Sequence, residues 1–177
     1  TVAVIGAGPA GLCTMMCARL YTPAKIIAID PDESRLALAK EQGLADVILV
    51  PGKEEIEKSV LRETGGRGAD RVFEAAGAAK TFCLAWQIAR PNAIVTVVAM
   101  YEEDQILPLP VMYGKNLTFK TGGVDGSDCE EIMNLISCGK LDTGFLITHR
   151  MDFAHIMDAY DIFEKKKDHV IKIAIRY

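Results

Sequence analysis

The chain has 177 residues, of which half are hydrophobic and a quarter are charged. This composition suits a protein with a buried core and excludes an intrinsically disordered chain. The formal net charge of −4 argues against nucleic-acid binding through neutralised phosphates. No apolar run approaches the roughly 18 residues that a bilayer span needs. We therefore expect neither a nucleic-acid partner nor a membrane partner.

The five cysteines follow neither a disulfide pattern nor a zinc-finger pattern. Their number is odd, no two of them are spaced as CxxC, and the three histidines lie far from most of them in sequence. Several fall in apolar helical patterns, where a thiol behaves as a small hydrophobe, so we expect a reducing, cytoplasmic location. The chain opens within a predicted strand and without a signal peptide, which predicts a fragment of a larger protein.

Strands and helices alternate through the first part of the chain. The second predicted helix illustrates the pattern, since it begins at Pro31 and stops before Gly43, as helix start and stop chemistry favours. A linker with two prolines precedes the sixth strand. Apolar strands that alternate with helices predict an α/β fold with a doubly wound parallel sheet. Strands are predicted at residues 2–5, 25–29, 46–50, 70–73, 93–99 and 117–120, and helices at residues 9–20, 31–42, 54–63 and 79–89.

The pattern changes in the last part of the chain. Ser127 and Glu130 have the spacing of a capping box and predict a helix that ends at Gly139. Asp152 is predicted to cap a later helix with apolar side chains on one face and lysines on a solvated face of its last turn. A final strand is expected at residues 170–175.

A glycine-rich motif connects the first strand to the first helix. Gly6, Gly8 and Gly11 form GxGxxG, with Pro9 and Ala10 between the last two. In this setting the first glycine permits a tight turn, the second lets the backbone approach a pyrophosphate, and the third lets the helix pack closely on the strand. The helix then offers unpaired N–H groups and its positive end to phosphates. The motif predicts a Rossmann fold with a bound dinucleotide; the alternative is a tight turn without a ligand.

An acidic residue ends the second strand. Asp30 follows the glycine motif at the spacing where a carboxylate accepts hydrogen bonds from the adenosine ribose hydroxyls, and it would repel the extra phosphate of NADP. NAD is therefore favoured over NADP. Arg35, one turn into the next helix, could lay its guanidinium on the adenine ring. The alternatives are a simple helix-start role for Asp30, before Pro31, and a surface role for Arg35.

Ligands of such sheets bind outside the carboxyl ends of the strands, so the other loops there are further candidates. Small residues would leave room for a cofactor, although small residues also occur wherever loops are tight. The candidates are Ala75, Ala76 and Gly77 after the fourth strand, Val98, Ala99 and Met100 after the fifth, and Thr121 and Gly122 after the sixth.

Taken in order, these segments resemble the cofactor domain and C-terminal segment of the zinc-dependent medium-chain alcohol dehydrogenases. The resemblance covers nearly the whole chain and is more specific than the glycine motif alone. It rests on VAVIGAGPAG, IIAIDPDESRLALAKEQGLADVI, GGRGADRVFEAAG, IVTVVAM, LPLPVMYGKNLTFKTGG and LITHRMDFAHIMDAYDIFEKKKDHVIKIAI.

The resemblance implies a role for each candidate residue. Residues 1–140 would be the dinucleotide-binding domain, and residues 141–177 a segment that returns to the catalytic domain. Lys172 would lie near the cofactor phosphates. Gly8, Pro9 and Ala10 would face the pyrophosphate, Asp30 the ribose and Arg35 the adenine; Ala75, Ala76 and Gly77 would line the groove, and Val98, Ala99, Met100, Thr121 and Gly122 would hold the nicotinamide end.

In that family a zinc ion polarises the alcohol oxygen while hydride passes to the nicotinamide. The family's zinc ligands come from a domain that precedes the first strand of this chain, so we predict neither a metal ligand nor a catalytic residue here. His149, His155 and Cys129 do not match the ligand positions. The resemblance implies NAD as cofactor, with zinc and a small alcohol or carbonyl substrate only in the full-length protein. Edge-to-edge pairing of cofactor domains would make a homo-oligomer.

Three other readings of the residues stay open. A regulatory NAD-sensing module could use the same fold without catalysis, and the zinc-free quinone reductases share this half of the family's chain. A flavoprotein is the third, because GAGPAG also occurs in FAD-binding folds. Those folds usually carry glutamate at the second strand end, from which the run Asp30-Pro31-Asp32 departs.

Overall fold

A computed structural model describes residues 1–123 and 126–177 of the chain. By its internal contacts the chain divides into two compact units, unit 1 (Thr1–Asp125) and unit 2 (Gly126–Tyr177). The division lies before a helix that the sequence prediction placed in the first domain. Among the described residues, no helix is both long enough and apolar enough to cross a bilayer.

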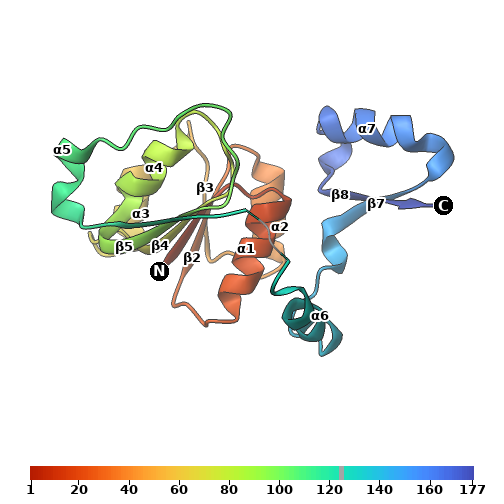
Figure 1. Ribbon diagram of the computed structural model, residues 1–177, viewed down its shortest axis with the longest axis horizontal. Coiled ribbons are helices and arrows are strands. Elements are labelled where there is room, and N and C mark those ends of the chain that lie inside the picture. Colours follow the sequence, from red (N-terminus) through yellow and green to blue (C-terminus); the bar gives the residue numbers. More distant parts are fainter. Residues whose placement is uncertain (124–125) are drawn as a thin grey trace. The chain divides into compact units, whose positions relative to one another are not determined.

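Unit 1 is built on a six-stranded sheet with the order β3-β2-β1-β4-β5-β6, and every neighbouring pair is parallel (Figure 1). The order reverses between β1 and β4, where the chain crosses from one half of the sheet to the other. This confirms the predicted doubly wound sheet and places its switch point between β1 and β4. The strands are β1 (Val2–Ile5), β2 (Ile26–Ile29), β3 (Val47–Leu49), β4 (Ala69–Glu74), β5 (Ala89–Val97) and β6 (Thr118–Thr121).

Helices cover both faces of this sheet, α1 and α2 on one face and α3 and α4 on the other (Figure 1). Alternate side chains of a strand point to opposite faces, so strands covered on both sides must be apolar throughout. All residues of β1 and β2 are accordingly buried. The helices of unit 1 are α1 (Pro9–Arg19), α2 (Glu33–Glu41), α3 (Ile56–Glu63), α4 (Thr81–Ile88) and α5 (Leu109–Met112).

Two features of unit 1 differ from the sequence prediction. Helix α2 begins at Glu33 and not at Pro31, because the carboxylate of Asp32 caps it by accepting hydrogen bonds from the amides of Ser34 (2.9 Å) and Arg35 (3.4 Å). The proline-containing linker before β6 includes the short helix α5. Its four residues carry too little periodicity to be recognised in the sequence.

Unit 2 pairs two parallel strands beside one helix. Helix α6 (Cys129–Ser137) precedes β7 (Ile147–Asp152), and α7 (Ile156–Glu164) connects β7 to β8 (Lys172–Arg176). A bridging hydroxyl helps to pair the strands, because the Oγ1 of Thr148 donates to the carbonyl of Lys172 (3.1 Å) and accepts from the amide of Ile171 (3.0 Å).

Of the two caps predicted for unit 2, the first is wrong and the second is right in position only. The N-cap of α6 is Asp128 and not Ser127, so the capping box is out of register by one residue. Asp152 ends β7, and its carboxylate pairs with the guanidinium of Arg176 at 3.0 Å, on the neighbouring strand. Asp152 is also the N-cap of a 3-10 turn, Phe153–His155, that continues directly into α7, although within the described chain no side-chain hydrogen bond caps that turn. The predicted start of the helical segment is therefore confirmed, while the carboxylate of Asp152 serves the strand pair.

Candidate functional site

The glycine motif adopts the tight turn that its sequence predicts. Gly6 has φ +98, and a Cβ on it would lie 3.0 Å from the carbonyl carbon of Ala75. A Cβ on Gly11 would lie 1.8 Å from the carbonyl oxygen of Gly6, which is far inside van der Waals contact. A Cβ on Gly8 would meet only a guanidinium nitrogen of Arg35, at 3.5 Å. The first and third glycines are thus required by the protein's own packing, whereas the second leaves space for a ligand.

The start of α1 opens onto that space. Gly8 is the N-cap of α1, and no side chain caps the helix by a hydrogen bond in the described chain. Pro9 occupies the first helical position, where its missing N–H costs nothing. No acidic residue occupies the first turn of α1. The turn therefore suits an anion such as a pyrophosphate, which uncapped N–H groups and the positive end of the helix dipole would stabilise.

Asp30 has a structural role that the sequence did not predict. Its side chain is buried, with the residue only 6% exposed. Its Oδ2 accepts a hydrogen bond from the amide of Ala7 (2.6 Å), and its Oδ1 accepts one from the amide of Asp32 (2.8 Å). A carboxylate oxygen has two acceptor positions, so each retains one for a ligand hydroxyl. Asp30 therefore ties the glycine turn to the end of β2 and still offers acceptors there.

Arg35 lies beside the same turn. Its Nε is 3.5 Å from the Oδ2 of Asp32, and its side chain is only 19% exposed. Burial raises the pKa of Asp32, but the hydrogen bonds from Ser34 and Arg35 outweigh it and the net pKa is lowered. Asp32 is therefore ionised at neutral pH and holds the guanidinium close to Gly8, the position where it can contact a bound nucleotide.

The loops after β4 and β5 meet directly. The amide of Ala75 donates to the carbonyl of Ile5 (2.8 Å), which joins the first loop to β1. Gly77 has φ +65, and a Cβ on it would lie 2.7 Å from the carbonyl oxygen of Met100. Val98, Met100, Thr121 and Gly122 are exposed, while Ala75 and Ala99 are partly buried. The predicted loop residues thus lie at the carboxyl edge of one sheet or in the turns that leave it. Pro9, Ala10 and Gly11 lie in the first turn of α1 and Arg35 in the first turn of α2, whereas Lys172 lies in β8 of unit 2.

The sequence analysis missed one residue of this edge. Glu74, the last residue of β4, is fully buried and accepts two backbone hydrogen bonds from the loop that follows. The signal was present in the sequence, because a carboxylate at the end of an otherwise apolar strand must be satisfied by nearby donors. The sequence analysis instead assigned the role at this strand end to the three small residues that follow Glu74.

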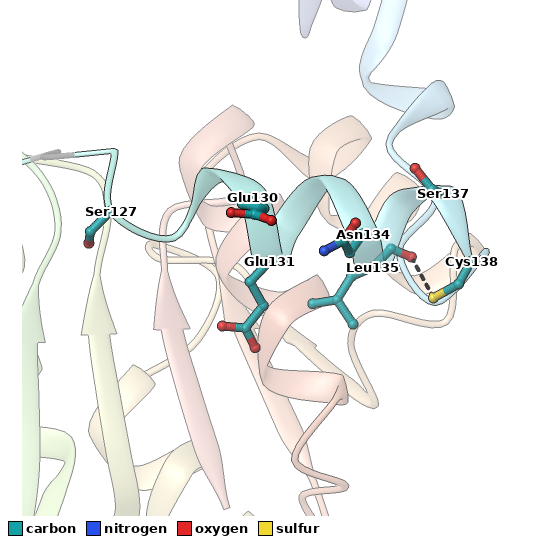
Figure 2. A pocket seen from close by; sticks show the side chains of 7 residues that line it. All are labelled: Ser127, Glu130, Glu131, Asn134, Leu135, Ser137 and Cys138. Carbon is teal, nitrogen blue, oxygen red and sulfur yellow. Dashed lines mark hydrogen bonds between the residues drawn. The ribbon is translucent and has the colours of Figure 1, made fainter.

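The surface hollows of the described chain include one on α6 and one along α1. One is lined by α6 and the turn before it, where acidic and small polar side chains project and Cys138 donates to the carbonyl of Leu135 (Figure 2). It contains none of the predicted cofactor-binding residues. An apolar groove along α1 reaches Ala10 and Val98 at one end and Tyr21 at the other. Within residues 1–123 and 126–177, no group of three or more histidine, cysteine, aspartate or glutamate side chains is placed to hold a metal ion.

Comparison with known protein families decides the relationship. The model of the zinc-binding dehydrogenase family matches residues 9–137. The chain belongs to the zinc-binding dehydrogenase family. This confirms the resemblance inferred from the sequence, and the matched region includes α1, the acidic end of β2 and the loops after β4, β5 and β6.

Known dehydrogenases align over almost the entire chain. An alcohol dehydrogenase from Cupriavidus necator is 35% identical over 99% of this chain and 49% of its own length. An NADP-dependent isopropanol dehydrogenase from Entamoeba histolytica is 31% identical over 99% of this chain and 50% of its own. The solved structure of a protein described as a short chain alcohol dehydrogenase from Escherichia coli, complexed with NADH, superposes with a TM-score of 0.91 at 27% identity, covering all of this chain and 52% of that one. The chain thus spans about half the length of these relatives.

Proposed function

We propose that this chain is the NAD(H)-binding part of a zinc-dependent alcohol dehydrogenase-like oxidoreductase. The observation that carries the proposal is the arrangement at the switch point of the sheet. There the uncapped start of α1, the open Gly8 and the buried carboxylate of Asp30 surround one space. These features fit the pyrophosphate and the adenosine ribose of a dinucleotide.

Asp30 and Arg35 have opposite preferences for the cofactor. The carboxylate of Asp30 favours the free ribose hydroxyls of NAD and would repel a phosphate attached there. The guanidinium of Arg35 could attract such a phosphate, but Asp32 already partly neutralises its charge at 3.5 Å. We therefore favour NAD. NADP is the second candidate, because an NADP-dependent relative is 31% identical over 99% of the chain.

In the whole protein, we expect hydride to pass between the carbon of a small alcohol and the nicotinamide ring. A zinc ion would polarise the alcohol oxygen and favour its deprotonation. The described residues do not form a metal cluster, so zinc and its ligands would belong to the rest of the protein. The chain by itself would bind the dinucleotide without turnover. A cytoplasmic homo-oligomer remains part of the proposal, and light scattering would measure the assembly.

Calorimetric titration of the 177-residue chain with NAD, NADP and FAD tests the proposal. We expect NAD to bind most tightly, and Asp30→Ala to narrow the difference between NAD and NADP, since the repelling charge is removed. Tighter binding of FAD than of NAD would contradict the assignment.

A second aspartate provides the matched control. The Oδ2 of Asp46 accepts from the amide of Ile26 at 2.6 Å, an equivalent bond at the opposite end of the strands. Asp46→Ala should therefore lower the thermal midpoint and leave the NAD to NADP ratio unchanged. Asp30→Asn, which keeps one acceptor oxygen, serves if Asp30→Ala does not fold.

A further inference from the structure

Glu74 carries a buried carboxylate whose two oxygens are bonded unequally. The residue is 0% exposed. Its Oε1 accepts hydrogen bonds from the amides of Ala76 and Gly77, both at 2.9 Å. Its Oε2 has no hydrogen bond of good geometry within the described part of the chain, although the carboxylate interacts with the hydroxyl of Tyr101. Burial of a carboxylate is costly, and a poorly bonded buried oxygen adds to that cost. A strand that needed only a packed core would be better served by an apolar residue here.

The main chain of Glu74 organises the next loop. Its carbonyl oxygen accepts hydrogen bonds from the amides of Val98 (2.7 Å) and Ala99 (3.1 Å). One residue therefore fixes two loops, residues 75–77 through its side chain and the start of residues 98–100 through its backbone. The contact between Gly77 and the Met100 carbonyl shows how closely these loops approach each other.

A tyrosine extends the same arrangement to α4. The hydroxyl of Tyr101 lies 2.9 Å from the Oγ1 of Thr81, the first residue of α4. Burial raises the pKa of Tyr101 to about 12, and hydrogen bonding of its hydroxyl to Glu74, together with the negative charge there, contributes to the rise. Tyr101 therefore stays a neutral phenol next to the carboxylate, and both loops and α4 are connected around Glu74.

We propose that Glu74 is the positioning residue for the nicotinamide half of the dinucleotide groove. It acts by setting the separation of the loops at residues 75–77 and 98–100. The inference rests on the proposed function, because it presumes that these loops line the groove. The adenosine half is built by Asp30 and Arg35 at the end of β2 and the start of α2, which Glu74 does not contact in any described hydrogen bond.

Because Glu74 would act on the nicotinamide half alone, comparing NADH with ADP-ribose distinguishes a positioning role from a purely structural one. NADH occupies the whole groove, whereas ADP-ribose lacks the nicotinamide and needs only the adenosine and pyrophosphate contacts. Disturbing Glu74 should weaken NADH binding and spare ADP-ribose binding. General destabilisation of unit 1 would weaken both ligands in proportion.

Two variants of Glu74 form a matched pair. Glu74→Gln keeps an oxygen that the amides of Ala76 and Gly77 can reach, whereas Glu74→Asp retracts the carboxylate by one methylene. We expect Glu74→Asp to raise the Kd of NADH about tenfold and the Kd of ADP-ribose less than about threefold, which is the scale of one or two lost hydrogen bonds. In Glu74→Gln both constants should stay within about threefold of those of the unchanged chain.

The outcomes separate the inference from the proposed function. If the unchanged chain binds neither NADH nor ADP-ribose, the proposed function fails and this inference fails with it. If the unchanged chain binds both and Glu74→Asp weakens both equally, or neither, only the inference is overturned. Should Glu74→Asp not fold, the amide NMR signals of Val98 and Ala99 in the unchanged chain decide. They should shift with NADH and not with ADP-ribose, and equal shifts with both would contradict the positioning role.

Discussion

The two units of the chain differ sharply in how much apolar surface they bury. In unit 1 the strands at the centre and the helices on both faces share a core with many fully buried side chains, among them Leu12, Ile27 and Leu36. In the described part of unit 2 the buried hydrophobic residues are few. They are Leu141, Leu146, Ala159, Val170 and Ile171. Large apolar side chains such as Met157 and Tyr160 of α7 remain exposed.

The difference in buried apolar surface indicates where each unit obtains its stability. A six-stranded sheet covered on both faces can hold its loops with its own core. A two-stranded sheet with one helix is marginal in water, and exposed apolar side chains on such an element are typical of a surface that contacts another part of a protein. Unit 1 should therefore retain its site when isolated, whereas unit 2 should depend on contacts beyond its own core.

Hydrogen exchange offers the largest expected contrast. We expect the backbone amides of β1, β2 and β4 to exchange at least about a hundredfold more slowly than those of β7 and β8, because exchange from a core strand needs extensive opening and exchange from a marginal unit does not. Mass spectrometry of peptides from the 177-residue chain would measure the ratio. Equal exchange rates in the two units would contradict the inference that unit 1 is the more stable one.

Replacement of the third glycine tests how tightly unit 1 is packed. Gly11→Ala places a Cβ 1.8 Å from the carbonyl oxygen of Gly6, so α1 must move away from β1. We expect the free energy of unfolding to fall by about 2–4 kcal/mol, measured by urea denaturation.

Gly114 provides the control for that variant. A Cβ on Gly114 meets no atom within 4 Å, so Gly114→Ala should change the unfolding free energy by less than about 0.5 kcal/mol. Hydrogen exchange in β7 and β8 should be the same in both variants. Faster exchange there in Gly11→Ala would mean that unit 2 takes its stability from unit 1.

A lysine gives a smaller effect within unit 1. The Nζ of Lys115 donates to the carbonyls of Trp86 (3.0 Å), Gln87 (2.5 Å) and Ala89 (2.9 Å), where α4 ends. Burial lowers the pKa of Lys115, which shows that the ammonium carries a desolvation cost there, and the three carbonyl acceptors offset part of that cost. We expect Lys115→Met to lower the unfolding free energy by about 1–3 kcal/mol, because the carbonyls lose their donor. Lys120→Met, at an exposed position of β6, should change it by less than about 0.5 kcal/mol.

Most of unit 1 was predictable because its signals are local. The GxGxxG motif needs only the strand before it and the helix after it, and both lie next to it in the sequence. The apolar strands and amphipathic helices repeat the same pattern, so the parallel sheet and its switch point follow from known connection rules. The position of Asp30 at the end of β2 followed in the same way.

The features that the sequence did not predict depend on contacts between residues that are distant in sequence. Asp152 occupies the predicted cap position, but its carboxylate pairs with Arg176 on the neighbouring strand and does not cap the helix. Glu74 acquires its importance from the amides of Val98 and Ala99, which reach it only when β5 lies beside β4. The second role of Asp30, as acceptor for Ala7, likewise requires β1 and β2 to be paired.

That second role of Asp30 limits how cofactor preference could evolve or be engineered. A change from NAD to NADP requires removal of the negative charge at this position. The same change would leave the amides of Ala7 and Asp32 without their acceptor, so the glycine turn would loosen as selectivity shifted. Lineages that switch cofactor would need a compensating acceptor for the Ala7 amide, and designers should install that acceptor before they replace the aspartate.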